Sequence, residues 1–134
     1  MAIVGFGFDK ILVNKKETKT QYKVQNNINV ISLSESKLPV GKEDVPVIKI
    51  TFDYLVDYEE AGKVELSGYV MYLDVVQKIK EILEKWKKDE KMPTEFGASI
   101  YNFIINRVSV KALQLEEDIG FPLHISLPKI MPKK

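Results

Sequence analysis

The chain has 134 residues, of which 45% are hydrophobic and 29% are charged. This length and composition predict one globular domain, residues 1–134, with its own buried core. With 20 basic and 19 acidic residues, the net charge of +1 provides no electrostatic attraction towards nucleic acid or an anionic membrane.

The sequence also limits the chemistry that the chain is expected to perform and the cellular compartment in which it is expected to lie. Cysteine is absent and His124 is the one histidine, so we expect no disulfide, no metal site and no histidine-based catalytic cluster. The N-terminal apolar run lacks a basic segment and a small-residue cleavage site, and no apolar run approaches the ~20 residues of a membrane span. We therefore expect a cytoplasmic protein, and since no residue pattern is equipped for bond-making chemistry, we expect that it is not an enzyme.

Two strands are predicted in the first third of the chain. Residues 3–13 predict a strand whose apolar residues of one parity would share a face. These residues are Val4, Phe6, Phe8 and Leu12. Alternation over residues 22–30 predicts a second strand with one polar face. Residues 34–44 are rich in Ser, Pro, Gly and charged residues, so we expect a loop there.

The next two strands are predicted as a hairpin. Residues 48–58 alternate most regularly, with one parity occupied by Ile48, Ile50, Phe52, Tyr54, Val56 and Tyr58. A short E-E-A-G turn, in which Gly62 can adopt positive φ, leads into alternation over residues 64–73. Strands joined by so short a turn must be antiparallel, so the sequence predicts a four-stranded antiparallel sheet.

The period changes from two to about 3.6 at Asp74, which is a suitable N-cap for a first helix. Pro93 ends that helix, Thr94 can cap a second one, and Gly120 can terminate it. We thus predict an α+β fold, a four-stranded antiparallel sheet followed by two C-terminal helices packed on one face. After Gly120, prolines at positions 122, 128 and 132 predict an extended tail.

The second helix carries more apolar residues than one sheet can cover. We therefore predict a homo-oligomer with an interface at Ile100, Tyr101, Ile104, Ile105 and Val108. Acidic residues 116–118 lie at the helix end that disfavours anions, so either they pair with Lys or Arg residues or the helix ends earlier. His124, flanked by Leu123 and Ile125, is predicted to be a surface residue.

Several segments resemble the SecB family of export chaperones. That family closes its long helix with a G-x-F-P-x-L-x-L-x-P type segment, and G-F-P-L-H-I-S-L-P at 120–128 is similar. The preceding helix, with Asn102, Phe103 and Arg107, also resembles the family pattern. So do V-P-V-I-K-I-T-F-D-Y-L-V-D-Y with its hairpin partner, and F-G-F-D-K-I near the N-terminus. The resemblance covers most of the chain and is that of a distant member of the family.

The resemblance implies an ATP-independent holdase without a cofactor. Such a protein binds unfolded or pre-export polypeptides in long apolar grooves and assembles as a dimer or as a tetramer built from two dimers. The candidate client-binding residues are Phe6, Phe8, Phe52, Tyr54, Tyr72, Phe121, Leu123 and Ile125. Each of them could instead pack in the core, because only exposure distinguishes a groove wall from a core residue.

Two departures from the family pattern bear on function. The family usually has a further helix after the Pro-containing tail, whereas this chain stops at Lys134, so one lip of the groove is expected to be absent. The near-neutral charge also differs from the acidic surface with which bacterial members dock on the SecA motor. The alternative function is a non-catalytic interaction module for one specific folded partner. An enzyme or nucleic-acid binder would instead need a pocket of convergent ionisable groups or a basic stripe.

Overall fold

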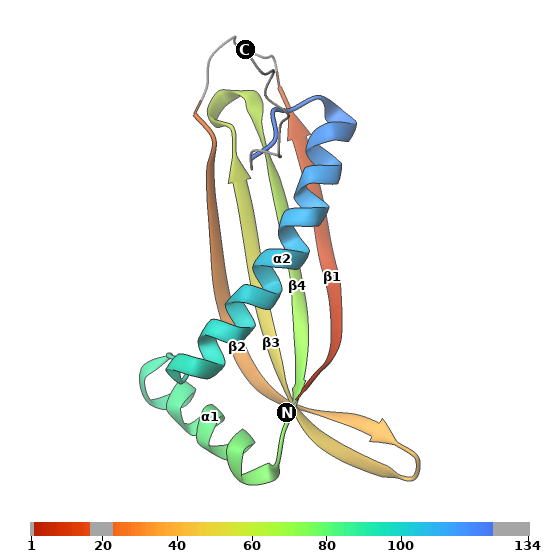
Figure 1. The fold of residues 1–134 in the computed structure, drawn as a ribbon, viewed down its shortest axis with the longest axis vertical. Coiled ribbons are helices and arrows are strands. Elements are labelled where there is room, and N and C mark those ends of the chain that lie inside the picture. The colour runs from red at the N-terminus through yellow and green to blue at the C-terminus, as the bar shows by residue number, and fades with distance from the viewer. Residues whose placement is uncertain (1, 17–22, 125–134) are drawn as a thin grey trace, which may run out of the picture.

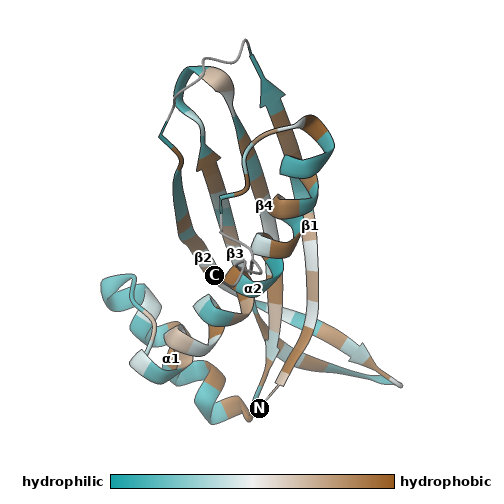
Figure 2. Ribbon diagram, turned by 45° about the horizontal axis from the view of Figure 1, so that its top comes forward, coloured by the Kyte–Doolittle hydropathy of each residue, from teal (hydrophilic) through white to brown (hydrophobic). Residues whose placement is uncertain are grey.

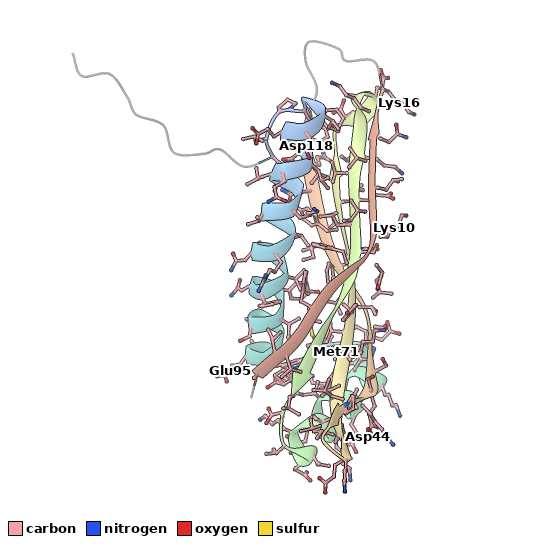
Figure 3. All side chains as sticks on the ribbon, turned by 90° about the vertical axis from the view of Figure 1, so that its right-hand side faces the viewer. Lys10, Lys16, Asp44, Met71, Glu95 and Asp118 are labelled. Carbon is pink, nitrogen blue, oxygen red and sulfur yellow. The ribbon has the colours of Figure 1, made fainter. Side chains whose placement is uncertain are left out.

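The computed structural model describes residues 2–16 and 23–124. The elements follow in the order β1 (Ala2–Lys15), β2 (Gln25–Val40), β3 (Glu43–Asp57), β4 (Gly62–Leu73), α1 (Val76–Asp89) and α2 (Thr94–Ile119). A 3₁₀ turn at Glu59–Ala61 leads into β4. The strands form one antiparallel sheet in the order β1-β4-β3-β2, and α2 runs along one of its faces (Figures 1 and 3). The predicted α+β class is confirmed.

The core lies between the helices and one face of the sheet. The alternation predicted for β3 is confirmed, because its even-numbered residues from Ile48 to Tyr58 are buried while the intervening residues are only partly covered. Figure 2 shows the same apolar and polar alternation along the strands. From the helices, the buried residues facing this side are Ile79, Ile82, Ile100, Ile104, Val108 and Ala112. Both helices therefore cover the same face.

The inward face predicted for β1 is wrong at both ends. The register of β1 against β4 shifts between Ile3 and Gly5 and again between Phe8 and Lys10. A β-bulge adds one residue on one strand, which reverses the inward and outward parity beyond it. Val4 and Leu12 are consequently exposed, whereas Ile3 and Val13 pack against the core. Phe6 and Phe8 lie between the two bulges and face inward as predicted.

The loop predicted at 34–44 is also wrong. β2 continues through these residues to Val40 and pairs with β3 up to Glu43, so that only Gly41 and Lys42 form the turn. Gly41 has a φ of 63°, which a two-residue hairpin turn requires and which glycine adopts at little cost. Pairing of β3 with β4 begins only at Ile48, so this hairpin projects beyond the rest of the sheet (Figure 1).

The helix boundaries differ slightly from the predicted ones. α1 is preceded by Val75 and not by Asp74, and α2 is preceded by Pro93, so that Thr94 is the first helical residue and not the cap. The predicted end of α2 is confirmed. Gly120 has a φ of 76°, and its N–H and that of the following residue donate to carbonyls of the last helical turn, which is a Schellman motif. In the described residues, no helix is long and apolar enough to cross a membrane.

Candidate functional site

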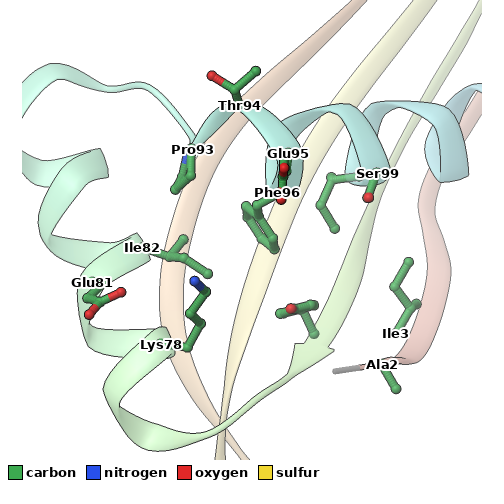
Figure 4. Close-up of a pocket in the computed structure, with 12 residues that line it drawn as sticks. Ala2, Ile3, Lys78, Glu81, Ile82, Pro93, Thr94, Glu95, Phe96 and Ser99 are labelled. Carbon is green, nitrogen blue, oxygen red and sulfur yellow. The ribbon is translucent and has the colours of Figure 1, made fainter.

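A groove of about 920 Å³ opens where the two helices meet the ends of β1 and β4 (Figure 4). Its apolar lining consists of Ala2, Ile3, Tyr72, Ile82, Pro93, Phe96 and Ile100. Its polar lining consists of Lys78, Glu81, Thr94, Glu95 and Ser99. An apolar depression edged by charges of both signs suits apolar side chains of a polypeptide better than a charged small molecule.

The turn after β4 sets the shape of this groove. The Tyr72 hydroxyl donates to Oδ2 of Asp74 at 2.7 Å, and Oδ1 of Asp74 accepts the Val75 N–H, also at 2.7 Å. Asp74 thus stabilises the bend that leads into α1, instead of capping the helix itself. After the bend, α1 contacts β2 and β3, and the Tyr72 ring lies in the groove lining.

The start of α2 supplies the opposite wall. The Gly97 N–H donates to the Pro93 carbonyl at 2.7 Å and closes the first turn. Phe96 packs edge-to-face against Tyr72, with 4.8 Å between the ring centroids and 70° between the planes. Gly97 is buried, and a Cβ there would lie 3.4 Å from Met92, so the helix starts close to the loop before it. The two aromatic rings therefore join the walls of the groove.

The electrostatics of Tyr72 keep the aromatic lining neutral. Burial, together with the hydrogen bond to Asp74 and its charge, raises the pKa of Tyr72 to about 12. The pKa of Asp74 is lowered, because although burial opposes ionisation, the bonds from Tyr72 and the Val75 amide favour the carboxylate. No group of three or more His, Asp or Glu residues in the described parts of the chain could hold a metal ion.

A smaller depression of about 380 Å³ lies on the other side of the first turns of α2. Val30 of β2, Trp86 of α1 and Tyr101 of α2 are among its lining residues. Together with the larger groove it flanks the start of α2 on both sides. Apolar surface is therefore accessible at this end of the molecule on either side of the helix.

The predicted client-binding residues fall into three places. Phe6, Phe8 and Phe52 form one aromatic cluster beneath α2, where Phe6 stacks on Phe52 at 5.7 Å and meets Phe8 edge-to-face at 5.1 Å. Tyr72 lies in the groove. Tyr54, Phe121 and Leu123 lie towards the C-terminal end of α2, where Tyr54 and Phe121 are buried and Leu123 is 37% exposed. Ile125 lies outside the described residues.

The aromatic cluster is covered by α2 in this chain. Phe103 packs against Phe6 at 5.6 Å, and the Arg107 guanidinium lies 5.7 Å from the centre of the Phe6 ring. Phe52 is fully buried, whereas Phe6 and Phe8 are only partly so. The structure therefore brings Tyr72 into an open groove but does not join it to the other candidate residues.

The predicted oligomer residues divide between two sides of α2. Ile100, Ile104 and Val108 are buried against the sheet of the same chain. Tyr101 is partly covered and Ile105 is 41% exposed. Residues four apart share a ridge on a helix, so the buried and exposed residues occupy neighbouring ridges.

The sequence-based prediction for His124 is wrong. Its side chain is 1% exposed and that of Glu116 is 0% exposed. His124 Nδ1 lies 2.6 Å and 2.8 Å from the two carboxylate oxygens of Glu116, and the His124 N–H donates to Oε1 at 3.0 Å. The helix continues past Glu116 to Ile119, and the partner of this acid is a histidine and not the predicted Lys or Arg.

A signal for this pair was present in the sequence. Glu116 continues the four-residue ridge of Ile100, Ile104, Val108 and Ala112, all of which face the sheet. A carboxylate on a buried ridge requires a hydrogen-bonding partner. The chain offers one histidine, a short distance beyond the glycine that reverses the backbone.

The comparisons with known proteins gave one structural likeness. No protein family and no curated protein matches this sequence. Among solved structures, the chain is similar to the Mycobacterium tuberculosis Rv1957 SecB-like chaperone in complex with a ChAD peptide from the Rv1956 HigA1 antitoxin. The similarity covers 99% of this chain and 92% of that chain, with 9% sequence identity and a TM-score of 0.42.

Proposed function

We propose that this protein is a non-catalytic, ATP-independent holdase that binds unfolded or pre-export polypeptides. The observation that carries the proposal is the groove of about 920 Å³, with an apolar lining that includes Tyr72 and Phe96 and charges of both signs among its other residues. Apolar side chains of an unfolded polypeptide would bury surface on Ile3, Tyr72 and Phe96. The sequence resemblance of residues 120–128 to the SecB family supports the same function.

The groove favours sequence-tolerant binding. Aromatic rings offer large contact areas at a low cost in conformational entropy, and they accept aliphatic and aromatic side chains alike. Tyr72 is neutral, and Lys78, Glu81 and Glu95 give the lining one positive and two negative charges, so the preference for the charge of a client is weak and favours basic segments. Neither a cofactor nor nucleotide hydrolysis is needed for such equilibrium binding.

We further propose that the exposed ridge of α2 is an interface between copies of this chain. Ile105 is 41% exposed, and Tyr101, which lies four residues before it on the same ridge, is only partly covered, whereas the neighbouring ridge already packs on the sheet. A second copy that packs on this ridge would bury both side chains. Assembly into a dimer or a tetramer would place grooves of several copies within reach of one long polypeptide.

The test is suppression of aggregation of a denatured client during refolding, measured by light scattering without ATP. Stoichiometric protein is expected to suppress aggregation. Phe96→Glu should weaken suppression by about tenfold, because it places a charge in the apolar groove (about 1.4 kcal/mol per tenfold). Gln114→Glu is the matched control, since it adds the same charge at an exposed position on the same helix and should leave suppression unchanged.

No suppression at several-fold molar excess would reject the holdase function. The alternative, a module for one folded partner, predicts a different pattern. In that case, one native protein would co-purify with the chain, its binding would be lost in Phe96→Glu, and denatured clients would not compete for it.

A further inference from the structure

The residues after α2 are held across the aromatic end of β3. The Phe121 ring stacks on the Tyr58 ring with 4.2 Å between centroids and 23° between planes. The Tyr58 hydroxyl donates to the Pro122 carbonyl at 2.7 Å. A Cβ on Gly62 would clash first with the Asn14 carbonyl and would also lie 3.0 Å from the Phe121 ring, so the glycine permits both close approaches. Aromatic stacking and a main-chain hydrogen bond thus fix one extended stretch of chain.

The second point of attachment is Glu116. Its carboxylate accepts the main-chain N–H of His124 at 3.0 Å and contacts the imidazole Nδ1 at 2.6 Å. The imidazole also meets the Tyr54 ring edge-to-face at 6.2 Å. Lys15 also lies near the segment, since its Nζ donates to the Ile119 carbonyl at 2.7 Å and lies 5.9 Å from the Phe121 ring centre. The contacts with this segment therefore involve one aromatic ring, one histidine side chain and the main chain.

We infer that this end of the sheet is a second polypeptide-binding site, and that residues 121–124 occupy it as an internal ligand. The site would accept an extended segment of another chain with an aromatic residue followed three positions later by a histidine. This inference rests on the proposed function, since it assigns a further site and a sequence preference to a polypeptide-binding protein.

The contacts themselves indicate the chemistry of the ligand. Tyr58 binds a ring and a carbonyl, while Glu116 binds an amide N–H and an imidazole. A carboxylate buried only to close the end of a core costs desolvation that an apolar pair would avoid. At a peptide site, the same carboxylate captures a main-chain N–H and selects a basic side chain.

The contacts of residues 121–124 would also allow this internal segment to leave the site. His124 Nε2 is buried and lacks a hydrogen-bond partner among the described residues, so the occupied state is not fully satisfied. Pro122 and Leu123 are exposed, so two side chains, Phe121 and His124, provide the buried contacts of residues 121–124. Gly120, with its positive φ, is the residue at which the backbone turns away from α2.

The test measures binding of a fluorescent peptide with the sequence of residues 120–129 to the full chain. Phe121→Ala and His124→Ala each weaken the internal segment and leave the site intact. Because the tethered segment competes at an effective concentration on the order of millimolar, both variants should bind the peptide at least about tenfold more tightly than the unmodified protein. The double variant Glu116→Gln/His124→Ala should lose this gain, since it also changes the site.

One control peptide and one displacement measurement accompany this test. A peptide with Ala in place of its Phe and its His should not bind to either variant. In the unmodified protein, an unlabelled peptide in excess should shift the single imidazole resonance of isotope-labelled His124, because displacement moves that ring from a buried site into water. No gain for either single variant, together with an unshifted His124 resonance, would overturn the inference.

The result is distinguishable from a failure of the proposed function. The groove is lined by residues at the start of α2, and its lining does not include Tyr58 or Glu116, so the effect expected of Phe96→Glu on suppression of aggregation is separate from the second site. If peptide binding shows no gain while aggregation is still suppressed, the holdase stands and only the second site is rejected. If aggregation is not suppressed but Phe121→Ala and His124→Ala gain affinity, the second site stands on its own.

Discussion

At the scale of single residues, a charge at a buried position organises one end of the molecule. Glu116 is fully buried, and its described partners belong to His124. Removing one member of a buried pair leaves the other without compensation, which generally destabilises more than removing both. Among the described residues, the buried His124 Nε2 has no hydrogen-bond partner, and such an atom generally costs about 1–3 kcal/mol.

The phenol of Tyr54 gives a prediction at this scale. Burial, and secondly the charge of Glu116, raises its pKa to about 12 from 10.0. The folded state thus favours the protonated phenol, so this contribution to stability is complete below pH 10 and is lost as the pH rises from 10 to about 12. We expect the ¹³C ring resonances of Tyr54 to titrate near pH 12.

Glu116→Gln provides the control for this titration. It should lower the pKa of Tyr54, because one of the two causes of the shift is removed. The pKa of Tyr72 should stay at about 12, since burial and Asp74 cause its shift. Titration of Tyr54 near pH 10 in the unmodified protein would contradict the environment described for it.

At the scale of elements, the regular patterns were predictable from the sequence. The alternation from Ile48 to Tyr58 predicted β3 because every second residue packs in one core, and Gly120 predicted the end of α2 because it alone adopts positive φ there without strain. The bulges in β1 were not predictable from parity, since one extra residue reverses every side chain beyond it.

The hairpin of β2 and β3 shows a second limit. Its residues 34–44 have the composition of a loop, yet they pair across the two-residue turn at Gly41 and Lys42. Local composition does not reveal this, because backbone hydrogen bonds to the opposite strand, and not burial, hold a projecting hairpin. Of the groove, the sequence predicted Tyr72 as a client-binding residue, but the contribution of α1 depends on the bend at Asp74.

At the scale of the whole molecule, one face of the sheet and one ridge of α2 are already packed within a single chain. The ridge with Tyr101 and Ile105 is apolar surface that the fold leaves partly exposed on α2. Burial of such side chains in an interface stabilises association by roughly 25 cal/mol per Å² of apolar area, before the cost of lost freedom.

We therefore predict that light scattering at micromolar concentration gives the mass of two or more chains, each of 15.4 kDa. Ile105→Asp should reduce the mass to that of one chain, because it places a carboxylate in the proposed interface. Gln77→Asp adds the same charge at an exposed position of α1 and should leave the mass unchanged. A mass of one chain for the unmodified protein would remove the oligomer from the proposal.

The most direct test of the central claim is photo-crosslinking from the groove itself. A photoreactive amino acid at Ser99, which is exposed and lines the groove, should crosslink to a denatured client without ATP, whereas the same amino acid at Gln114 should not. The Ser99 crosslink should be lost when the client is folded and when Phe96→Glu is introduced. Equal crosslinking from both positions, or none from Ser99, would contradict the assignment of this groove as the polypeptide-binding site.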